Sequence, residues 1–251
     1  MKKSTIGVMG IGEVGTAISQ ICRIFFKVLK KDIHYDEIKS TKLEVLHVCI
    51  PYKSNFEKSV TDQIRKSKPE LVIIHSTVKP GTTASIFKKT GTAIVHSPVM
   101  GTHPNLKRDI LKFTKFIGPT SKESANLAQN HFKIVGIKTT FLRDSFETEL
   151  AKLLDTTYYA WNIIFNKIVA QVCQDLKVNF ENVYTKFNQV YNEGYKISKP
   201  NVVRPVLKFQ KGPIGGTCVV PNAQILHDSK PTPLTDFIIK FNKQLGNEKD
   251  Q

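Results

Sequence analysis

The sequence predicts an α/β protein in which a doubly wound, mostly parallel sheet is followed by a smaller α-helical domain. Short apolar runs alternate with helical patterns over residues 1–145, and a glycine-rich turn follows the first run. Residues 147–177 then form one long helical pattern that contains neither proline nor glycine. We therefore expect two domains, residues 1–145 and residues 146–251, each of ordinary size.

The alternation predicts the elements of the first domain. Strands are expected at 4–9, 42–51, 69–78, 92–99, 112–118 and 137–142, with a further short strand that ends at Asp36. Helices are expected directly after the glycine-rich turn and at 54–66, 81–90 and 121–135. Strands that alternate with helices in this way are typical of a parallel sheet with helices on both faces.

The glycine-rich turn reads GIGEVG, which is G-x-G-x-x-G between an apolar strand and a helical pattern. Gly10 permits the tight turn, Gly12 lets the backbone approach a pyrophosphate, and Gly15 lets the helix pack closely on the strand. The start of that helix then faces the phosphates. The expected binding loop consists of Gly10, Ile11, Gly12, Glu13, Val14 and Gly15. This pattern predicts a Rossmann-like dinucleotide site.

A carboxylate about 20 residues after such a turn binds the ribose hydroxyls of NAD and repels the 2′-phosphate of NADP. Asp36 is expected in that position, so the sequence favours NAD. The alternative interpretation is a glycine turn and an unrelated surface aspartate. Ligands of these sheets bind beyond the carboxyl ends of the strands, which predicts that Pro51, Ser76, Thr77 and residues 96–105 surround the cofactor.

The long helical pattern at 147–177 carries apolar residues on more than one face, which is typical of a helix buried between domains or subunits. It favours a homodimer. Lys152, Thr156 and Tyr159 share another face by their i, i+4 and i+3 spacing. Further helices are expected at 179–195, after Pro221 and at 233–245, around an irregular segment at 199–216 that is rich in proline and glycine.

The formal net charge of +16 raises the question of a nucleic-acid or membrane partner. The lysines are scattered, however, and KVLKKD at 27–32 is expected in a loop or on a solvent face, so the sequence predicts small anionic molecules as partners instead. No apolar run approaches the ~20 residues that span a bilayer, and the N-terminus has no cleavage site typical of a signal peptide. We expect a cytoplasmic protein that binds neither membrane nor nucleic acid.

The four cysteines lie far apart without a C-x-x-C pair, so their spacing predicts neither a disulfide framework nor a metal site. Cys22, Cys49 and Cys173 occur in apolar patterns and are expected in the core. Cys218 differs, because it follows a glycine pair in GPIGGTCVVPN at 212–222. Cys218 is either a small residue that fills the loop, or a nucleophile in a loop whose glycines leave room for a ligand.

Five segments together resemble the UDP-glucose/GDP-mannose dehydrogenases, which are nucleotide-sugar 6-dehydrogenases that use NAD. The segments are GIGEVG at 10–15, VCIP at 48–51, HSTVKPGTT at 75–83, ETELAKLLDTTYYAWNIIFNKI at 147–168 and GPIGGTCVVPN at 212–222. The resemblance runs over nearly the whole chain. It also implies that the family's second dinucleotide-like domain, which completes the sugar-nucleotide pocket, has no counterpart in these 251 residues.

The resemblance implies roles for individual residues. Cys218 corresponds to the nucleophile that attacks the aldehyde from a first hydride transfer, which gives a thiohemiacetal and, after a second transfer, a thioester that is hydrolysed. Lys152 corresponds to the lysine that stabilises oxyanion charge, and Thr77 to the threonine of the water network. A thiolate is the reactive form of cysteine, and a nearby ammonium favours it.

Three positions depart from the family pattern. Thr156 replaces an asparagine, Asn222 replaces an aspartate, and Val99 replaces the glutamate of an S-P-E segment. An amide does not titrate, so Asn222 cannot act as a general base. The departures predict a trapped thioester or a two-electron product instead of efficient acid formation.

Two hypotheses of function follow. The chain is either an NAD-dependent oxidoreductase that acts on a sugar or nucleotide-sugar-like alcohol or aldehyde, in saccharide biosynthesis, or an NAD-binding protein with impaired catalysis that acts as a regulatory partner in polysaccharide synthesis. His96 and His103 are candidates for the missing acid or base, since histidine titrates near neutrality. Substrate contacts are expected from Arg204, His103, Gly215 and Gly216.

Overall fold

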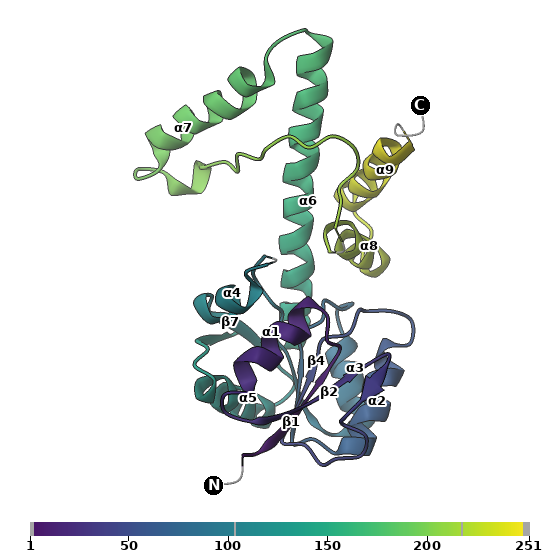
Figure 1. The fold of residues 1–251 in the computed structure, drawn as a ribbon. Coiled ribbons are helices and arrows are strands. Elements are labelled where there is room, and N and C mark those ends of the chain that lie inside the picture. The colour runs from purple at the N-terminus through teal and green to yellow at the C-terminus, as the bar shows by residue number, and fades with distance from the viewer. Residues whose placement is uncertain (1–2, 103, 217, 248–251) are drawn as a thin grey trace. The chain divides into compact units, whose positions relative to one another are not determined.

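The computed structural model describes residues 3–102, 104–216 and 218–247. The chain forms two compact units, Met1–Lys152 and Leu153–Gln251. The predicted boundary at 145 coincides with the start of the long helix α6 (Ser145–Asp175), whose first turns belong to the first unit. Figure 1 shows the sheet and its helices in the first unit and only helices and loops in the second.

The first unit is built on an eight-stranded sheet of order β3-β2-β1-β4-β5-β6-β7-β8. The strands are β1 (Thr5–Met9), β2 (Lys27–Asp32), β3 (Tyr35–Asp36), β4 (Val45–Val48), β5 (Leu71–Ile74), β6 (Ala93–His96), β7 (Lys115–Pro119) and β8 (Thr139–Phe141). Strands β2, β1, β4, β5 and β6 run parallel, whereas β3 pairs antiparallel with β2 and β7 antiparallel with β6. The predicted class, a doubly wound and mostly parallel sheet, is confirmed.

Helices cover both faces of this sheet (Figure 1). One face carries α1 (Glu13–Cys22), α4 (Leu106–Lys112) and α5 (Lys122–Ile134), and the other carries α2 (Phe56–Ser67) and α3 (Thr82–Thr90). Alternate residues of a strand point to opposite faces, so Ile6 and Val8 pack into the core beneath α1 and α5. Leu46 and Val48 pack into the core beneath α2 and α3.

The expectation for residues 27–32 is wrong, because KVLKKD forms β2, hydrogen-bonded to β1 along its length. Its lysines suggested a solvated segment, but the strand lies between β3 and β1, and one of its lysines is paired with a carboxylate of β3. The Lys31 ammonium lies 2.7 Å from a carboxylate oxygen of Asp36 and donates to Gln63 at 2.7 Å. The helix α4 was not predicted either, and the strand expected from residue 112 begins at Lys115.

The turn between β1 and α1 brings backbone segments unusually close together. Gly10 has φ +92°, in the left-handed region that favours glycine, and a Cβ there would lie 2.8 Å from the backbone of Cys49. A Cβ on Gly15 would lie 1.8 Å from the carbonyl oxygen of Gly10. Only glycine at both positions allows α1 to begin against β1 and β4.

Glu149 connects the start of α6 to the start of α3. Its carboxylate accepts hydrogen bonds from the Gly81 amide at 2.6 Å and from the Thr83 amide and hydroxyl at 2.8 and 2.6 Å. The first amides of a helix lack partners within it, and Gly81 has no side chain to supply one. Burial raises the pKa of Glu149 to about 7. The hydrogen bonds from Gly81 and Thr83 lower this pKa, but their effect is smaller than that of burial.

The second unit is helical, as predicted. The rest of α6 is followed by a π-helical turn (Glu181–Lys186) that continues into α7 (Phe187–Tyr195), by a 3-10 turn (Pro200–Val202), and by α8 (Val219–Ser229) and α9 (Pro233–Asn247). A small core joins α6, the segment before α8, α8 and α9, and it is formed by Ala160, Ile164, Ile214, Val219, Ala223 and Ile238. Among the helices that the structure describes in either unit, none has the length and apolar composition needed to cross a membrane.

We predict that Gly15→Ala lowers the stability of the first unit by on the order of 3 kcal/mol, because the added methyl group overlaps the Gly10 carbonyl. Gly194→Ala is the matched control, since a Cβ at this helical position meets nothing within 4 Å. It should stabilise the chain by about 0.5–1 kcal/mol. Chemical denaturation of both variants tests the close approach, and equal effects would contradict it.

We also predict that Glu149→Gln destabilises the first unit by about 1–3 kcal/mol. The side-chain NH₂ group of glutamine would face a backbone amide of Gly81 or Thr83, and both groups are hydrogen-bond donors. Glu123→Gln, at an exposed position in the first turn of α5, is the control. Thermal unfolding compares the two. A Glu149 variant as stable as the control would show that this carboxylate does not hold the start of α3.

Candidate functional site

The order of strands reverses between β1 and β4, which is where doubly wound sheets bind their ligands. From β1 the chain passes to β2 on one side, whereas β4 and β5 lie on the other. The carboxyl ends of β1 and β4 carry the turns at Gly10–Gly12 and Cys49–Pro51. These turns touch, since the backbone of Gly10 lies against that of Cys49 and Ile50. They form the floor of the candidate site.

Gly12 is the residue before α1, and a Cβ built on it would meet nothing within 4 Å. The space beside this backbone is therefore open, unlike that beside Gly10 and Gly15. The first amides of α1, from Glu13 and Val14, begin at this point, and the positive end of a helix favours an anion there. The loop fits a phosphate or pyrophosphate group.

Two aspartates near the end of β2 have different partners. Asp32 ends β2 and accepts hydrogen bonds from the Ile11 amide of the glycine loop at 2.5 Å and from its neighbour Ile33 at 2.7 Å. The bond from Ile11 is the main cause of its lowered pKa. Asp36, which was expected near the cofactor, is paired with Lys31 and also accepts from the Lys39 amide at 2.8 Å.

Asp32 is thus a candidate that the sequence interpretation missed. Its distance from the glycine motif along the chain fits the rule of about 20 residues as well as that of Asp36 does. The assignment of residues 27–32 to a loop removed it from consideration. A strand at this position would have identified its last residue as the one beside the glycine loop.

The segment after β5 closes the other side of the floor. Ser76 is half-buried, and its hydroxyl donates to the Ile50 carbonyl at 2.6 Å. That bond joins the segment of Ser76 and Thr77 to the turn that contains the exposed Pro51. These three residues follow β4 and β5 at the carboxyl edge of the sheet, the edge at which the sequence predicted them.

His96 is buried at the end of β6, not in a loop. Its Nδ1 lies 2.9 Å from the Thr148 hydroxyl, and its Nε2 lies 3.2 Å from the Ser76 carbonyl, to which it must donate. Burial lowers the pKa of His96 to about 3, so the ring stays neutral at physiological pH. The hypothesis that it replaces a missing acid or base is therefore not supported, and His103 lies outside the described residues.

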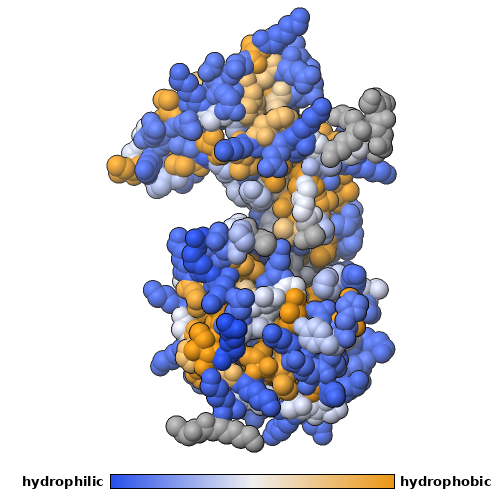
Figure 2. All heavy atoms as spheres, in the orientation of Figure 1, coloured by the Kyte–Doolittle hydropathy of each residue, from blue (hydrophilic) through white to orange (hydrophobic). Residues whose placement is uncertain are grey.

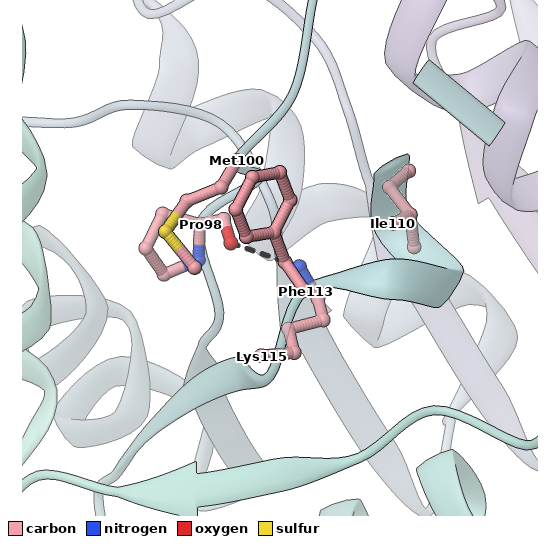
Figure 3. Close-up of a pocket in the computed structure, with 5 residues that line it drawn as sticks. All are labelled: Pro98, Met100, Ile110, Phe113 and Lys115. Atoms are coloured by element: carbon pink, nitrogen blue, oxygen red, sulfur yellow. Dashed lines mark hydrogen bonds between the residues drawn. The ribbon is translucent and has the colours of Figure 1, made fainter. Parts of the chain in front are cut away.

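Lys115 of β7 is a second residue that the sequence interpretation did not single out. Its buried ammonium donates to the carbonyls of Ser97 and Pro98, each at 2.9 Å, and burial lowers its pKa to about 7. Figure 3 shows Pro98, Met100 and Phe113 around it. The cavity there is about 10 Å³, which is room for one water molecule and not for a substrate. Lys115 fixes the backbone before Val99.

In the second unit, Cys218 is exposed and directly precedes α8. Gly216 has φ +84°, and a Cβ at Gly215 or Gly216 would meet nothing within 4 Å, so this loop is open to solvent. One turn after Cys218, the side-chain amide of buried Asn222 donates to the Thr156 hydroxyl at 3.3 Å. Two of the positions that depart from the family pattern are thus in contact.

The remaining described site residues belong to different units. Lys152 is half-buried on the part of α6 that belongs to the first unit. Arg204 is exposed in the second unit, where its guanidinium lies 3.7 Å above the Tyr191 ring and donates to Asn188 at 3.3 Å. This stacking holds the planar fork in one orientation.

Comparison with curated proteins finds relatives named as nucleotide-sugar dehydrogenases, although no family model matches the chain. Two curated relatives are UDP-N-acetyl-D-mannosamine dehydrogenases, from Methanocaldococcus jannaschii and Methanococcus aeolicus. They are 23% and 25% identical to the chain over 96% and 81% of its length. The chain spans 65% and 52% of their own length.

The fold agrees with these relatives. The solved structure of a UDP-N-acetyl-mannosamine dehydrogenase from Staphylococcus aureus matches with a TM-score of 0.76, at 15% identity, over 98% of this chain and 69% of that one. The chain is therefore similar in sequence to nucleotide-sugar dehydrogenases and shares their fold.

Proposed function

We propose that the chain is an NAD-dependent oxidoreductase that acts on a sugar or nucleotide-sugar-like alcohol or aldehyde in saccharide biosynthesis. The observation that carries the proposal is the open backbone at Gly12, set between two positions where only glycine fits. Open space beside a backbone directly before a helix lets a phosphate approach the first amides of that helix. Similarity to UDP-N-acetyl-D-mannosamine dehydrogenases suggests the class of substrate.

The residues around the glycine loop fit a dinucleotide. The first amides of α1 would bind the pyrophosphate, and Ser76, Thr77 and Pro51 would line the edge beyond β4 and β5. Asp32 is the better candidate for the ribose, because it touches the loop through Ile11, whereas Asp36 is engaged by Lys31. A carboxylate there repels a 2′-phosphate, which favours NAD over NADP. When bound, the nicotinamide ring supplies the hydride acceptor.

The catalytic assignments follow the family's motifs. The Cys218 thiolate adds to the carbonyl carbon of an aldehyde, and the Lys152 ammonium stabilises the oxyanion that this addition creates. Thr77 orders water near the reacting carbon. An exposed thiol in an open glycine loop is accessible to a substrate, which supports the nucleophile over the filler interpretation. We further propose that Arg204, Gly215 and Gly216 contact the substrate.

Hydrolysis of a thioester on Cys218 is expected to be slow. Val99 offers no carboxylate and packs against the core of the first unit. Asn222 cannot take a proton from water, and its amide is occupied by Thr156. An acyl-enzyme or a two-electron product therefore fits these residues better than efficient acid formation.

The same Asn222–Thr156 contact favours a second candidate function, a regulatory NAD-binding partner with impaired catalysis. In that case the chain would keep its cofactor site, and Asn222 and Thr156 would stabilise the helical unit without taking part in catalysis. Turnover separates the two candidates: the oxidoreductase reduces NAD in the presence of a sugar alcohol or aldehyde, and the regulatory protein binds NAD without reducing it.

We also propose that the chain pairs with a second copy through its helical unit. Large apolar side chains stay exposed there, among them Phe165, Val172 and Leu176 on α6 and Phe187 and Val190 on α7. Figure 2 shows such hydrophobic areas on the helices of this unit. Exposed apolar surface of this kind typically marks a protein interface.

Calorimetry should show that the chain binds NAD more tightly than NADP. Asp32→Asn should reduce this preference by ~10-fold or more, because the repulsion of the 2′-phosphate is lost. Asp36→Asn is the matched control, with the preference kept. The reverse result would assign the ribose to Asp36.

Gly12→Val should abolish binding of both cofactors while the thermal unfolding of the chain is nearly unchanged, since its side chain enters open space.

Intact-mass spectrometry after incubation with NAD and a panel of sugar aldehydes should reveal an adduct on wild-type protein that Cys218→Ala lacks. Cys173→Ala, at a buried cysteine of the same unit, should keep it. NADH absorbance gives the turnover in parallel. If the Cys218 variant turns over as fast as the wild type, the cysteine is not a nucleophile. Cys218 is then only a small residue that fills the glycine-rich loop.

A further inference from the structure

A row of polar side chains crosses the apolar core beneath α1 and α5. It consists of Cys22 at the end of α1, His47 on β4, His131 on α5 and His75 directly after β5, none of them more than 3% exposed. The residues around it are apolar, including Ile18, Phe26 and Phe132. Polar groups in such surroundings need partners, so each contact along the row matters.

The hydrogen bonds fix the direction of the row. His75 Nδ1 lies 3.0 Å from the Ser97 carbonyl and must donate to it, which leaves its Nε2 as an acceptor. His47 Nδ1, at 2.9 Å, must then donate to His75 Nε2. A neutral imidazole carries one proton, so His47 Nε2 is left with a lone pair. That lone pair is directed at Cys22, whose sulfur lies 3.9 Å away.

His131 completes the arrangement without a partner of its own. Its ring is stacked on Phe26, with centroids 5.2 Å apart, and tilted against His47 at 4.9 Å. Among the described residues, neither of its nitrogens has a hydrogen-bond partner. A buried polar group left unsatisfied costs about 1–3 kcal/mol. One ligand atom from each of Cys22, His47 and His131 lies within 4.8 Å of the others.

We propose that Cys22, His47 and His131 bind a thiophilic closed-shell metal ion, zinc(II) or copper(I), inside the first unit. A sulfur and two imidazole nitrogens are the donors that these ions prefer. Binding displaces the thiol proton of Cys22 to solvent and gives His131 the partner that it lacks. His75 then holds His47 from behind, as a hydrogen-bonded neighbour commonly does for a metal-binding histidine.

The geometry requires a small contraction. Donor atoms around a tetrahedral zinc lie ~3.3–3.6 Å apart, from the usual bond lengths, compared with 3.9 Å between the Cys22 sulfur and His47 Nε2 and with 4.8 Å as the limit for the three ligand atoms together. Side-chain rotations that move these atoms by about 1 Å supply the difference. The thiolate offsets all of the charge of copper(I) or half that of zinc(II). Offsetting charge matters here, because burial already lowers the pKa of nearby Lys115 to about 7.

The bound ion would hold α1, β4 and α5 together. The helix α1 starts at the glycine loop and ends at Cys22, so the ion would anchor the far end of the helix that forms the candidate dinucleotide site. All three residues are buried, so the ion is expected to enter as the chain folds. This proposal is independent of the function proposed above, because it concerns a different part of the sheet.

The experiment uses the full chain, refolded from denaturant with zinc(II), with copper(I) under reducing conditions, or with a chelator alone. Native mass spectrometry and elemental analysis should show one ion per chain in one of the two metal arms, and the midpoint of thermal unfolding should rise by ~5 °C or more relative to the chelator arm. The metal arm that gives this result identifies the ion. Wild-type protein that retains no ion in either arm would overturn the proposal.

Variants locate the site. His131→Phe keeps the aromatic packing on Phe26 and Cys22→Ala removes the thiol; both should lose the ion and the rise in the unfolding midpoint. Cys173→Ala, at a buried cysteine of the second unit, should keep both. In the absence of metal, His131→Phe should be at least as stable as the wild type, because it removes two unsatisfied nitrogens.

Cobalt(II) gives an independent readout, since a thiolate ligand produces a charge-transfer absorption that histidines alone do not. The wild type should show this band and Cys22→Ala should not. If the ion is retained by Cys22→Ala and His131→Phe, it is bound elsewhere, for example by exposed His34, and the proposal fails. If His131→Phe is less stable than the wild type without metal, a trapped water and not a metal satisfies His131, and the proposal fails as well.

Discussion

The close approach of α1 to the ends of β1 and β4 is the constraint on which the rest of the first unit depends. The carbonyl of Gly10 occupies the place where any side chain at position 15 would begin, and the backbone of Cys49 occupies the place of a side chain at position 10. These contacts set the start of α1 directly over the reversal of strand order. The open backbone of Gly12 and the contact of Asp32 with Ile11 are consequences of that placement.

A second constraint is that polar side chains buried in the core must find hydrogen-bond partners. Glu149, His96 and Lys115 are all buried, and each is held by hydrogen bonds to loops that follow β5 or β6. Burial shifts the pKa of each in the direction that favours its neutral form, while the hydrogen bonds hold each side chain in one position. The row from Ser97 to Cys22 is built in the same way, and His131 lies beside it with no hydrogen-bond partner among the described residues.

The sequence predicted those features that depend on local patterns. The glycine spacing of GIGEVG, the alternation of strands and helices and the uninterrupted pattern of α6 can each be recognised within a short stretch of sequence. The strand β2 was missed because its lysines suggested a solvated segment, whereas Lys31 pairs with the Asp36 carboxylate and donates to the Gln63 side chain. The contact between Asn222 and Thr156, and the meeting of Cys22, His47 and His131, depend on topology and have no signature in spacing.

The central claim is that the chain binds a dinucleotide at the reversal point of its sheet. Titration of isotope-labelled protein with NAD, followed by amide chemical shifts, tests it most directly. The account predicts that the largest changes occur at the amides of Gly10–Gly15, at Asp32 and Ile33, and at Cys49 and Ile50, with smaller changes elsewhere in the first unit. Saturable changes confined to other residues, or none at millimolar NAD, would contradict it.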